Sequence, residues 1–313
     1  MESLAAYLRD MDLQAAAADG FAAPERLSED EQRRAVFTGS GDSLAAAMLA
    51  EAFSDYRVRA LDPREIGRNP RIVAGRSLYI VSVSGRTAAN VRLAREHGAV
   101  AITAVPDSAL ARAARRTIPL SFPNSDTLTA GSISFLNSAL VCLSLVRPAL
   151  PRNAPRILER ARRDAASTPH GDRTYFVGNQ HTFPVAMYAA AKTYEILGAD
   201  AHYARTEQFA HMELFSAKPG DAAVFFDDGE QVREMVDALE RQGISCNVAE
   251  PRLGDPVSDI IYDIFYAQAL PLNRTDGGAE VYFMDADALR GISDAVIYED
   301  WGIFTIETES RAA

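Results

Sequence analysis

Short apolar runs alternate with longer helix-forming segments along most of this chain. The clearest run, residues 77–81, is brief, apolar and β-branched, and therefore predicts a buried strand. Residues 88–96 are good helix formers, and the His97-Gly98 pair after them is typical of a helix C-terminus. Because strands and helices keep alternating, the pattern predicts a parallel sheet covered by helices on both faces, and the fold class is α/β.

The same pattern places further elements in order. We expect strands at residues 34–38, 57–61, 100–105, 118–120, 174–177 and 222–226, and helices at 1–18, 44–53, 109–116, 128–146 and 184–197. Prolines at positions 148, 151 and 155 interrupt the pattern, which sets a domain boundary near Leu150. The sequence thus predicts one domain over residues 1–150 and a second over residues 151–313.

The two predicted domains look like repeats of one unit. In the first, Gly39 follows a strand and Gly85 comes forty-six residues later; in the second, Gly178 and Gly229 stand fifty-one residues apart in matching positions. This spacing predicts two tandem copies of the same α/β arrangement.

One loop carries the most distinctive chemistry of the chain. Residues 82–87 read Ser-Val-Ser-Gly-Arg-Thr and stand between a predicted strand and a predicted helix. Unpaired amides at a helix N-terminus favour an anion, and Gly85 lets the main chain approach one closely. The candidate phosphate cradle therefore consists of Ser82, Ser84, Arg86 and Thr87. The alternative is a serine-rich turn in which Thr87 is an ordinary helix cap.

Charge distinguishes this loop from its counterpart in the second domain. There, Asp227, Asp228 and Glu230 stand at the matching helix start. Carboxylates at that point would repel a phosphate by several times the roughly 1 kcal/mol that surface charges exchange. We therefore expect only the first domain to bind phosphate.

Composition narrows the class of protein. The chain has 313 residues, of which 48% are hydrophobic and 24% charged, as in a globular protein of two ordinary domains. Its net charge of -11 disfavours nucleic-acid binding, and we find neither an apolar membrane span nor a basic leader, so we expect a cytoplasmic protein.

Cys142 and Cys246 lie in apolar surroundings in different halves, as buried thiols do. We expect no metal and no cofactor.

A glycine-rich turn invites a second interpretation. Gly39-Ser40-Gly41 follows a strand, and Asp62 ends the next strand, where a ribose-binding acid would stand. The dinucleotide fingerprint needs a small residue at its sixth position, whereas this chain has Leu44 there. NAD binding is therefore the weaker interpretation of this turn.

Together, residues 39–43 (Gly-Ser-Gly-Asp-Ser), the loop at residues 82–87 and the duplicated halves resemble the sugar isomerase (SIS) domain family. That family includes the isomerase part of glucosamine-6-phosphate synthase and archaeal phosphosugar isomerases. The resemblance covers nearly the whole chain and implies two tandem SIS-type domains, each a flavodoxin-like sandwich with a parallel sheet flanked by helices. It implies that a sugar phosphate is held by its phosphate at Ser82, Ser84 and Thr87, with Ser43 contributing from the first loop.

The resemblance also implies a homodimer with a shared active site, and it implies catalytic residues in the second domain. The family's glutamate follows a lysine by three residues on a long helix, as Glu195 follows Lys192. Its ring-opening histidine, donated by the partner subunit, comes sixteen residues later, and His211 stands at that spacing. A carboxylate can move a proton between C1 and C2, and an imidazole can protonate or deprotonate the ring oxygen. Taken singly, Lys192 and Glu195 also fit a helical ion pair, and His211 fits a packed histidine.

One departure from the family bears on catalysis. No lysine follows Lys218, although the related synthases and dual-specificity isomerases have one near the C-terminus; residues 301–307 here read Trp-Gly-Ile-Phe-Thr-Ile-Glu. The favoured function is aldose–ketose isomerisation of a hexose or hexosamine 6-phosphate, or deamination of an amino-sugar phosphate. The alternative is a sensor that binds a phosphosugar without converting it.

Overall fold

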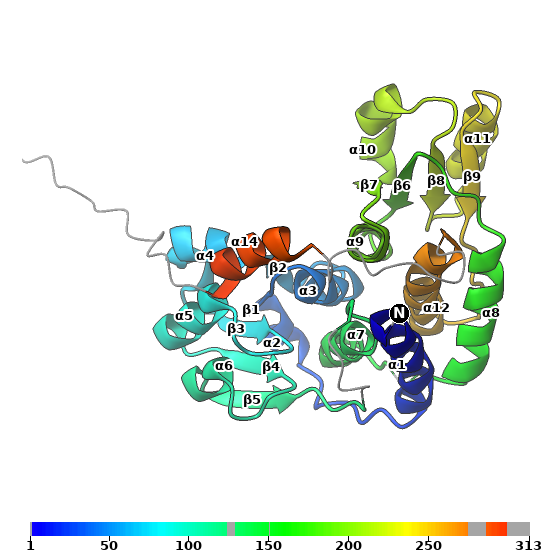
Figure 1. The fold of residues 1–313 in the computed structure, drawn as a ribbon. Helices are drawn as coiled ribbons and strands as arrows, with labels where there is room; N and C mark the ends of the chain where they lie inside the picture. The colour runs from blue at the N-terminus through cyan, green and yellow to red at the C-terminus, as the bar shows by residue number, and fades with distance from the viewer. Residues whose placement is uncertain (1, 124–128, 150, 275–285, 299–313) are drawn as a thin grey trace, which may run out of the picture.

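The computed structural model describes residues 2–123, 129–149, 151–274 and 286–298. It contains two parallel sheets with a layer of helices between them and further helices on their outer faces (Figure 1). This is the α/β architecture that the alternation of strands and helices predicts. Within the described ranges, no helix is both long and apolar enough to cross a lipid bilayer.

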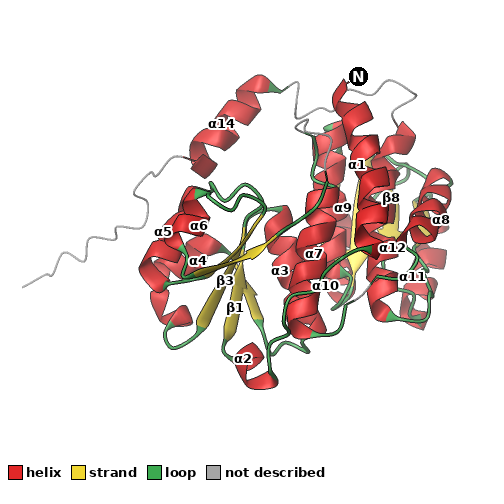
Figure 2. Ribbon diagram, turned by 90° about the horizontal axis from the view of Figure 1, so that it is seen from below, coloured by secondary structure: helices red, strands yellow, loops and turns green. Residues whose placement is uncertain are grey.

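The first sheet has five parallel strands in the order β2-β1-β3-β4-β5. These strands are β1 (Ala35–Thr38), β2 (Arg59–Leu61), β3 (Ser77–Val81), β4 (Val100–Thr103) and β5 (Arg116–Pro119). The outer face is covered by α4 (Pro63–Arg68), η1 (Pro70–Val73), α5 (Ala88–His97) and α6 (Ala109–Ala113). The inner face packs against α3 (Asp42–Phe53) and α7 (Ile133–Val146), and the short α2 (Glu29–Arg33) precedes β1 (Figure 2).

The second sheet repeats this topology with four parallel strands in the order β7-β6-β8-β9. These strands are β6 (Arg173–Gly178), β7 (Asp200–Arg205), β8 (Ala222–Phe225) and β9 (Ser245–Val248). The outer face is covered by α10 (Thr206–His211), η2 (Glu213–Ser216) and α11 (Glu230–Glu240). The inner layer holds α1 (Glu2–Asp19), α8 (Ala154–Ala166), α9 (Phe183–Leu197) and α12 (Pro256–Ala269), and the chain continues into η3 (Leu270–Arg274) and α14 (Asp287–Tyr298).

One apolar core runs through both halves. Phe37 of the first sheet and Phe176 of the second belong to the same buried cluster, which the helices between the sheets make continuous. Separate, smaller cores lie under the outer helices of each sheet. Because the main core is shared, the two halves pack as one body, and the boundary near Leu150 stays a prediction; residue 150 itself lies outside the described residues.

The predicted elements form close to their predicted bounds, with exceptions that have physical causes. Arg116, expected to end a helix, begins β5 instead. The helix expected from residue 128 begins as α7 at Ile133, and residues 124–128 lie outside the described residues. The pattern does not predict β7, because the sequence of this edge strand, Asp-Ala-His-Tyr-Ala-Arg, has neither an apolar run nor a regular alternation. Nor does it predict α12, whose side chains are buried almost all round, so that no polar face marks its helical period.

A buried glutamine joins four helices in the shared layer. Gln268 Nε2 on α12 lies 3.1 Å from the hydroxyl of Tyr188 on α9 and 3.3 Å from the Ser132 carbonyl that precedes α7. Its side chain also exchanges hydrogen bonds with Gln14 on α1, and the Tyr7 hydroxyl donates to its backbone carbonyl at 3.1 Å. These side chains have almost no exposed surface, so water cannot replace a lost partner.

We therefore predict that Gln268→Ala lowers the free energy of unfolding by about 2–4 kcal/mol, because it removes several buried hydrogen bonds and leaves a cavity. Gln242→Ala, at an exposed turn, is the matched control and should change stability by less than about 0.5 kcal/mol. Urea denaturation followed by circular dichroism measures both. A loss at Gln268 no larger than the control would contradict the proposed role.

Candidate functional site

Four of the five predicted phosphate-binding residues line one cavity, namely Ser43, Ser82, Ser84 and Thr87. It has a volume of about 660 Å³ and lies at the carboxyl ends of β3 and β4, where the first sheet meets the start of α7. Its polar lining comprises Asp10, Ser43, Ser82, Ser84, Thr87, Thr129, Ser132 and Ser134. The loops that the sequence singles out thus meet in space, while their role in binding stays a prediction.

Glycine shapes the loop after β3. Gly85 has a φ of +62°, and a Cβ there would lie 2.1 Å from Ser108 Oγ, so no other residue fits without a shift of the neighbouring chain. Thr87 stands at the N-cap of α5 as predicted, but its hydroxyl makes no capping hydrogen bond. The interpretation of Thr87 as an ordinary side-chain cap is therefore wrong, and its hydroxyl is available to a ligand.

Arg86 does not join the cradle. Its guanidinium lies 5.0 Å from the ring centroid of Tyr298 on α14, and Arg86 is absent from the residues that line the cavity. The expectation that this arginine would contact the phosphate is therefore not supported by the geometry. The cradle offers hydroxyls and helix amides, with no arginine among its lining residues.

The start of α7 supplies the opposite wall. Ser132 and Ser134 line the cavity, and the buried Ser132 hydroxyl has no hydrogen-bond partner among the described residues. Buried hydroxyls are usually hydrogen-bonded in folded proteins, so this one has an unused capacity to donate to or accept from a polar group in the cavity. Ser138, one turn after Ser134 on α7, does not line the cavity and donates to the Ser134 carbonyl at 2.8 Å.

Lys192 forms the centre of an ion cluster beside this wall. Its side chain is fully buried on α9, and Nζ lies 2.9 Å from Asp42 Oδ2 and in direct contact with the Glu195 carboxylate. The same ammonium stands 4.9 Å from the ring centroid of Tyr188, one turn earlier on α9. The predicted ion pair between Lys192 and Glu195 is thus present, and Asp42 makes it a triad.

Burial and charge act against each other within this triad. Burial lowers the pKa of Lys192, but Asp42 and Glu195 more than offset that effect, so its pKa is raised and the lysine is an ammonium. Burial raises the pKa of Glu195, and the neighbouring Asp42 adds to this, while Lys192 pulls it down; the net direction is upward. Glu195 is therefore a stronger base than an exposed carboxylate.

Gly131 connects the triad to the cavity. A Cβ at this position would lie 2.7 Å from Asp42 Oδ2, 3.5 Å from Ser134 Oγ and 3.7 Å from Lys192 Nζ. Its carbonyl accepts a hydrogen bond of 2.6 Å from the Tyr188 hydroxyl, which fixes the chain there. Since Gly131 also lines the cavity, the ion cluster lies directly behind the cavity wall.

His211 lies away from this cluster within the subunit. It ends α10, which packs on the outer face of the second sheet, whereas Glu195 belongs to α9 on the inner face. The imidazole side chain is 68% exposed, and its Nε2 lies 3.0 Å from Glu207 Oε1. Within the chain, Lys192 lies behind the cavity wall at Gly131 and contacts Glu195, whereas His211 lies on the outer side of the second sheet.

Sequence reasoning gave no role to three residues of this site. Asp42 stands in the first glycine-rich loop, and only its contact with Lys192 reveals its part. Tyr188 stands four residues before Lys192, a spacing that does place two side chains on one helix face. Gly131 carries no sequence signal apart from its place before a long apolar helix. Asp62, the candidate ribose ligand, accepts a hydrogen bond from the Arg64 amide and caps α4.

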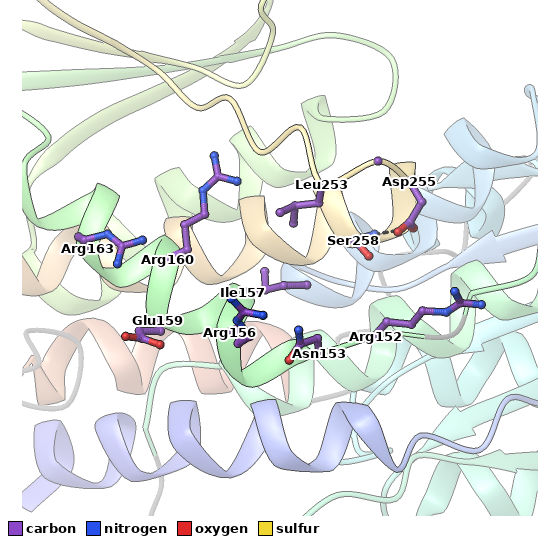
Figure 3. A pocket seen from close by; sticks show the side chains of 11 residues that line it. Arg152, Asn153, Arg156, Ile157, Glu159, Arg160, Arg163, Leu253, Asp255 and Ser258 are labelled. Atoms are coloured by element: carbon purple, nitrogen blue, oxygen red, sulfur yellow. Dashed lines mark hydrogen bonds between the residues drawn. The ribbon is translucent and has the colours of Figure 1, made fainter.

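A larger cavity lies elsewhere, between α8 and the loop before α12. Its volume is about 770 Å³, and Arg152, Arg156, Arg160 and Arg163 project along one side of it (Figure 3). The Arg160 guanidinium donates hydrogen bonds to the backbone carbonyls of Glu250 and Pro251. None of the predicted site residues lines this cavity.

Comparison with known proteins bears on the fold. No family model matches the sequence, and no curated protein matches it. Many solved structures resemble the chain at low sequence identity, among them the following three. Glucosamine-6-phosphate deaminase from Thermotoga maritima has a TM-score of 0.69 and 16% identity, covering 87% of this chain and 95% of its own. The C-terminal domain of glucosamine-fructose-6-phosphate aminotransferase from Francisella tularensis has a TM-score of 0.66 and 17% identity, covering 88% and 97%.

The third, tagatose-6-phosphate ketose/aldose isomerase from Escherichia coli, has a TM-score of 0.59 and 15% identity, covering 86% of this chain and 90% of its own. At such identities the likeness establishes the fold. The chain therefore has the SIS-type fold, as its resemblance to that family in the two loops and the duplicated halves predicts.

Proposed function

We propose that this chain acts on a sugar phosphate, as an isomerase that moves the carbonyl group between C1 and C2 or as a related amino-sugar deaminase. One observation carries the proposal: the hydroxyl-lined cavity ends beside the buried Lys192, which holds Glu195. Structures of the same fold add support, since they include a glucosamine-6-phosphate deaminase and a tagatose-6-phosphate isomerase.

In this proposal the phosphate binds at the loop of residues 82–87. Ser82, Ser84 and Thr87 supply hydroxyls, and the first amides of α5 supply the partial positive charge of a helix N-terminus. Ser43 reaches the same cavity from α3. Hydrogen bonds to a charged phosphate are stronger than those to a neutral hydroxyl, so the phosphate supplies most of the affinity.

Glu195 is the proposed base. It takes the proton from C2 of the open-chain aldose and returns it to C1, while a proton passes from the C2 oxygen to the C1 oxygen, which yields the ketose. The raised pKa of Glu195 favours this exchange because a base works best when its pKa approaches the operating pH. Lys192 holds the carboxylate in place and is a positioning residue in this scheme.

His211 is proposed to act from the partner subunit of a homodimer. Its exposure supports this assignment, since a histidine that serves another subunit must lie on the surface of its own. The apolar side chains of Met212 and Phe215 next to it are 56% and 83% exposed. Large exposed apolar groups beside a candidate catalytic residue favour contact with a second copy.

A sensor that binds phosphosugar without turnover is the second candidate. The observation that favours it is the absence of any lysine after Lys218, where the resembled enzymes have one that reaches the sugar. Incubation with hexose and hexosamine 6-phosphates, followed by chromatography of the products, separates the two. Conversion supports the enzyme, and binding without conversion supports the sensor.

We predict that binding depends on the phosphate and on the cradle. Ser84→Ala or Thr87→Ala should weaken binding of the sugar phosphate by about 1.5–3 kcal/mol each, because each removes a hydrogen bond to a charged group. Ser245→Ala, on an exposed position of β9, is the control and should bind as the unmodified chain does. Isothermal titration calorimetry measures the affinities, and equal affinity for sugar and sugar phosphate would rule out the cradle.

We predict that Glu195→Gln keeps the affinity for the phosphosugar but slows turnover by roughly a hundredfold to ten-thousandfold, because the amide cannot accept the C2 proton. Exchange of the C2 proton with deuterated solvent, followed by NMR, reports this step directly. Lys192→Ala should reduce exchange less, and Glu240→Gln on the exposed end of α11 should leave it unchanged. Normal exchange in Glu195→Gln would mean that the base lies elsewhere.

We predict that active sites are rebuilt in mixed dimers. His211→Ala and Glu195→Gln proteins should each be inactive, while a mixture whose subunits exchange should regain up to about a quarter of the activity, since half of the dimers are hybrids with one intact site of two. Native mass spectrometry verifies the exchange. Zero activity in a fully exchanged mixture would show that His211 does not act across the interface.

A further inference from the structure

The second sheet has a cavity of its own at the place where its helices change sides. Strand β6 leads into α9 on the inner face, whereas the neighbouring β8 leads into α11 on the outer face. In open α/β sheets such a switch point, at the carboxyl ends of the strands, is where ligands bind. A cavity of about 200 Å³ lies there, lined by the loops after β6, β8 and β9 and by α12.

This cavity is separate from the candidate active site. Its residues His181 and Thr182 stand at the start of α9, about 15 Å along the helix from Lys192, at 1.5 Å per residue. Phe53, which also lines it, ends α3, while Asp42 and Ser43 of the candidate active site begin that helix. The two cavities therefore lie at opposite ends of α3 and share no lining residue.

The repeat relates the two cavities. A Cβ on Gly39 would lie 2.7 Å from Ser43, and a Cβ on Gly178 would lie 2.8 Å from Thr182, so the same close turn leads from the first strand of each sheet into the helix that follows it. In the first half this turn leads to the candidate phosphate site. In the second half it leads to the cavity beside α12.

A buried acid without a partner points into the second cavity. Asp263 on α12 is 2% exposed and lines the cavity, and within the part of the chain that the structure describes its Oδ1 has no hydrogen-bond partner. A buried carboxyl group left without a partner costs stability, and a ligand that donates a hydrogen bond would remove that cost. Burial raises the pKa of Asp263, and the nearby Asp259 raises it further. No positive charge close to Asp263 among the residues that the structure describes offsets these two effects.

The charge of the remaining lining is negative. Asp227, Asp228 and Asp259 face the cavity with Asp263, and Arg252 offsets one of them through its 3.2 Å ion pair with Asp228. Burial and the nearby Arg147 lower the pKa of His181, so the imidazole adds no positive charge at neutral pH. The aromatic rings of Phe53 and Phe226 complete the wall.

We propose that this second cavity binds a small molecule that carries a primary ammonium group. The ammonium supplies the hydrogen-bond donors that Asp263 lacks and the positive charge that the surrounding aspartates favour. A metal ion fits less well, because the described residues contain no group of three or more histidine, cysteine, aspartate or glutamate side chains placed to hold one. This inference stands apart from the proposed function and survives if the chain proves to be a sensor.

The test compares pairs of small molecules that differ in the ammonium group alone. Glucosamine and ethanolamine are titrated beside glucose and ethylene glycol by saturation-transfer NMR, none of them carrying a phosphate. Each amine should bind at least tenfold more tightly than its neutral partner. Equal binding within each pair, or no binding at concentrations up to about 50 mM, would overturn the proposal.

Variants then locate the binding. Asp263→Asn and Asp227→Asn should each weaken amine binding at least fivefold. If Asp263→Asn fails to fold, Asp227→Asn still tests the cavity, because Asp227 is only half-buried. Asp237→Asn, exposed on α11, removes the same charge outside the cavity and should have no effect. Ser84→Ala should also have none. Binding that is lost in Ser84→Ala but kept in both cavity variants would assign the amine to the phosphosugar site and reject the proposal.

Discussion

A buried ammonium must have negative partners, and Lys192 obtains one from each half of the molecule. Asp42 begins the first helix after β1, and Glu195 stands one turn further along the helix that carries Lys192. Without both carboxylates the charge would lie uncompensated among apolar helices, a state that costs several kcal/mol. This pairing fixes α3 against α9 at the end where the hydroxyl-lined cavity opens, and it positions the carboxylate that the proposed chemistry uses.

The shared layer of helices explains why the site can depend on both halves. The main core continues from the first sheet to the second, and Gln268 links α1, α7, α9 and α12 through buried hydrogen bonds. A polar network of this kind is satisfied in one arrangement of the helices only, so it defines their relative positions. The start of α7, with Gly131 and the unpartnered Ser132 hydroxyl, is thereby held against the ion cluster.

The two halves keep the same topology but differ in charge at their switch points. The first half presents serine and threonine hydroxyls at the end of β3, which suit an anion, while the second presents Asp227 and Asp228 at the end of β8, which suit a cation. Backbone geometry is thus repeated, whereas a few side chains give the cavity of each half a different charge. Fold likeness to phosphosugar proteins therefore supports the architecture, whereas the chemistry of each half depends on the side chains at its own site.

The sequence by itself determined what depends on neighbouring residues. Apolar runs and helix formers marked most strands and helices, the order of hydroxyls and glycine marked the loop at residues 82–87, and spacing marked the pair Lys192 and Glu195. The tertiary structure decided what depends on distant residues. Asp42 meets Lys192 from 150 positions away, Arg86 turns to Tyr298 instead of the cradle, and Asp263 stays without a partner beside a cavity. Such contacts arise from how helices pack across the shared core, and local sequence patterns carry no record of that packing.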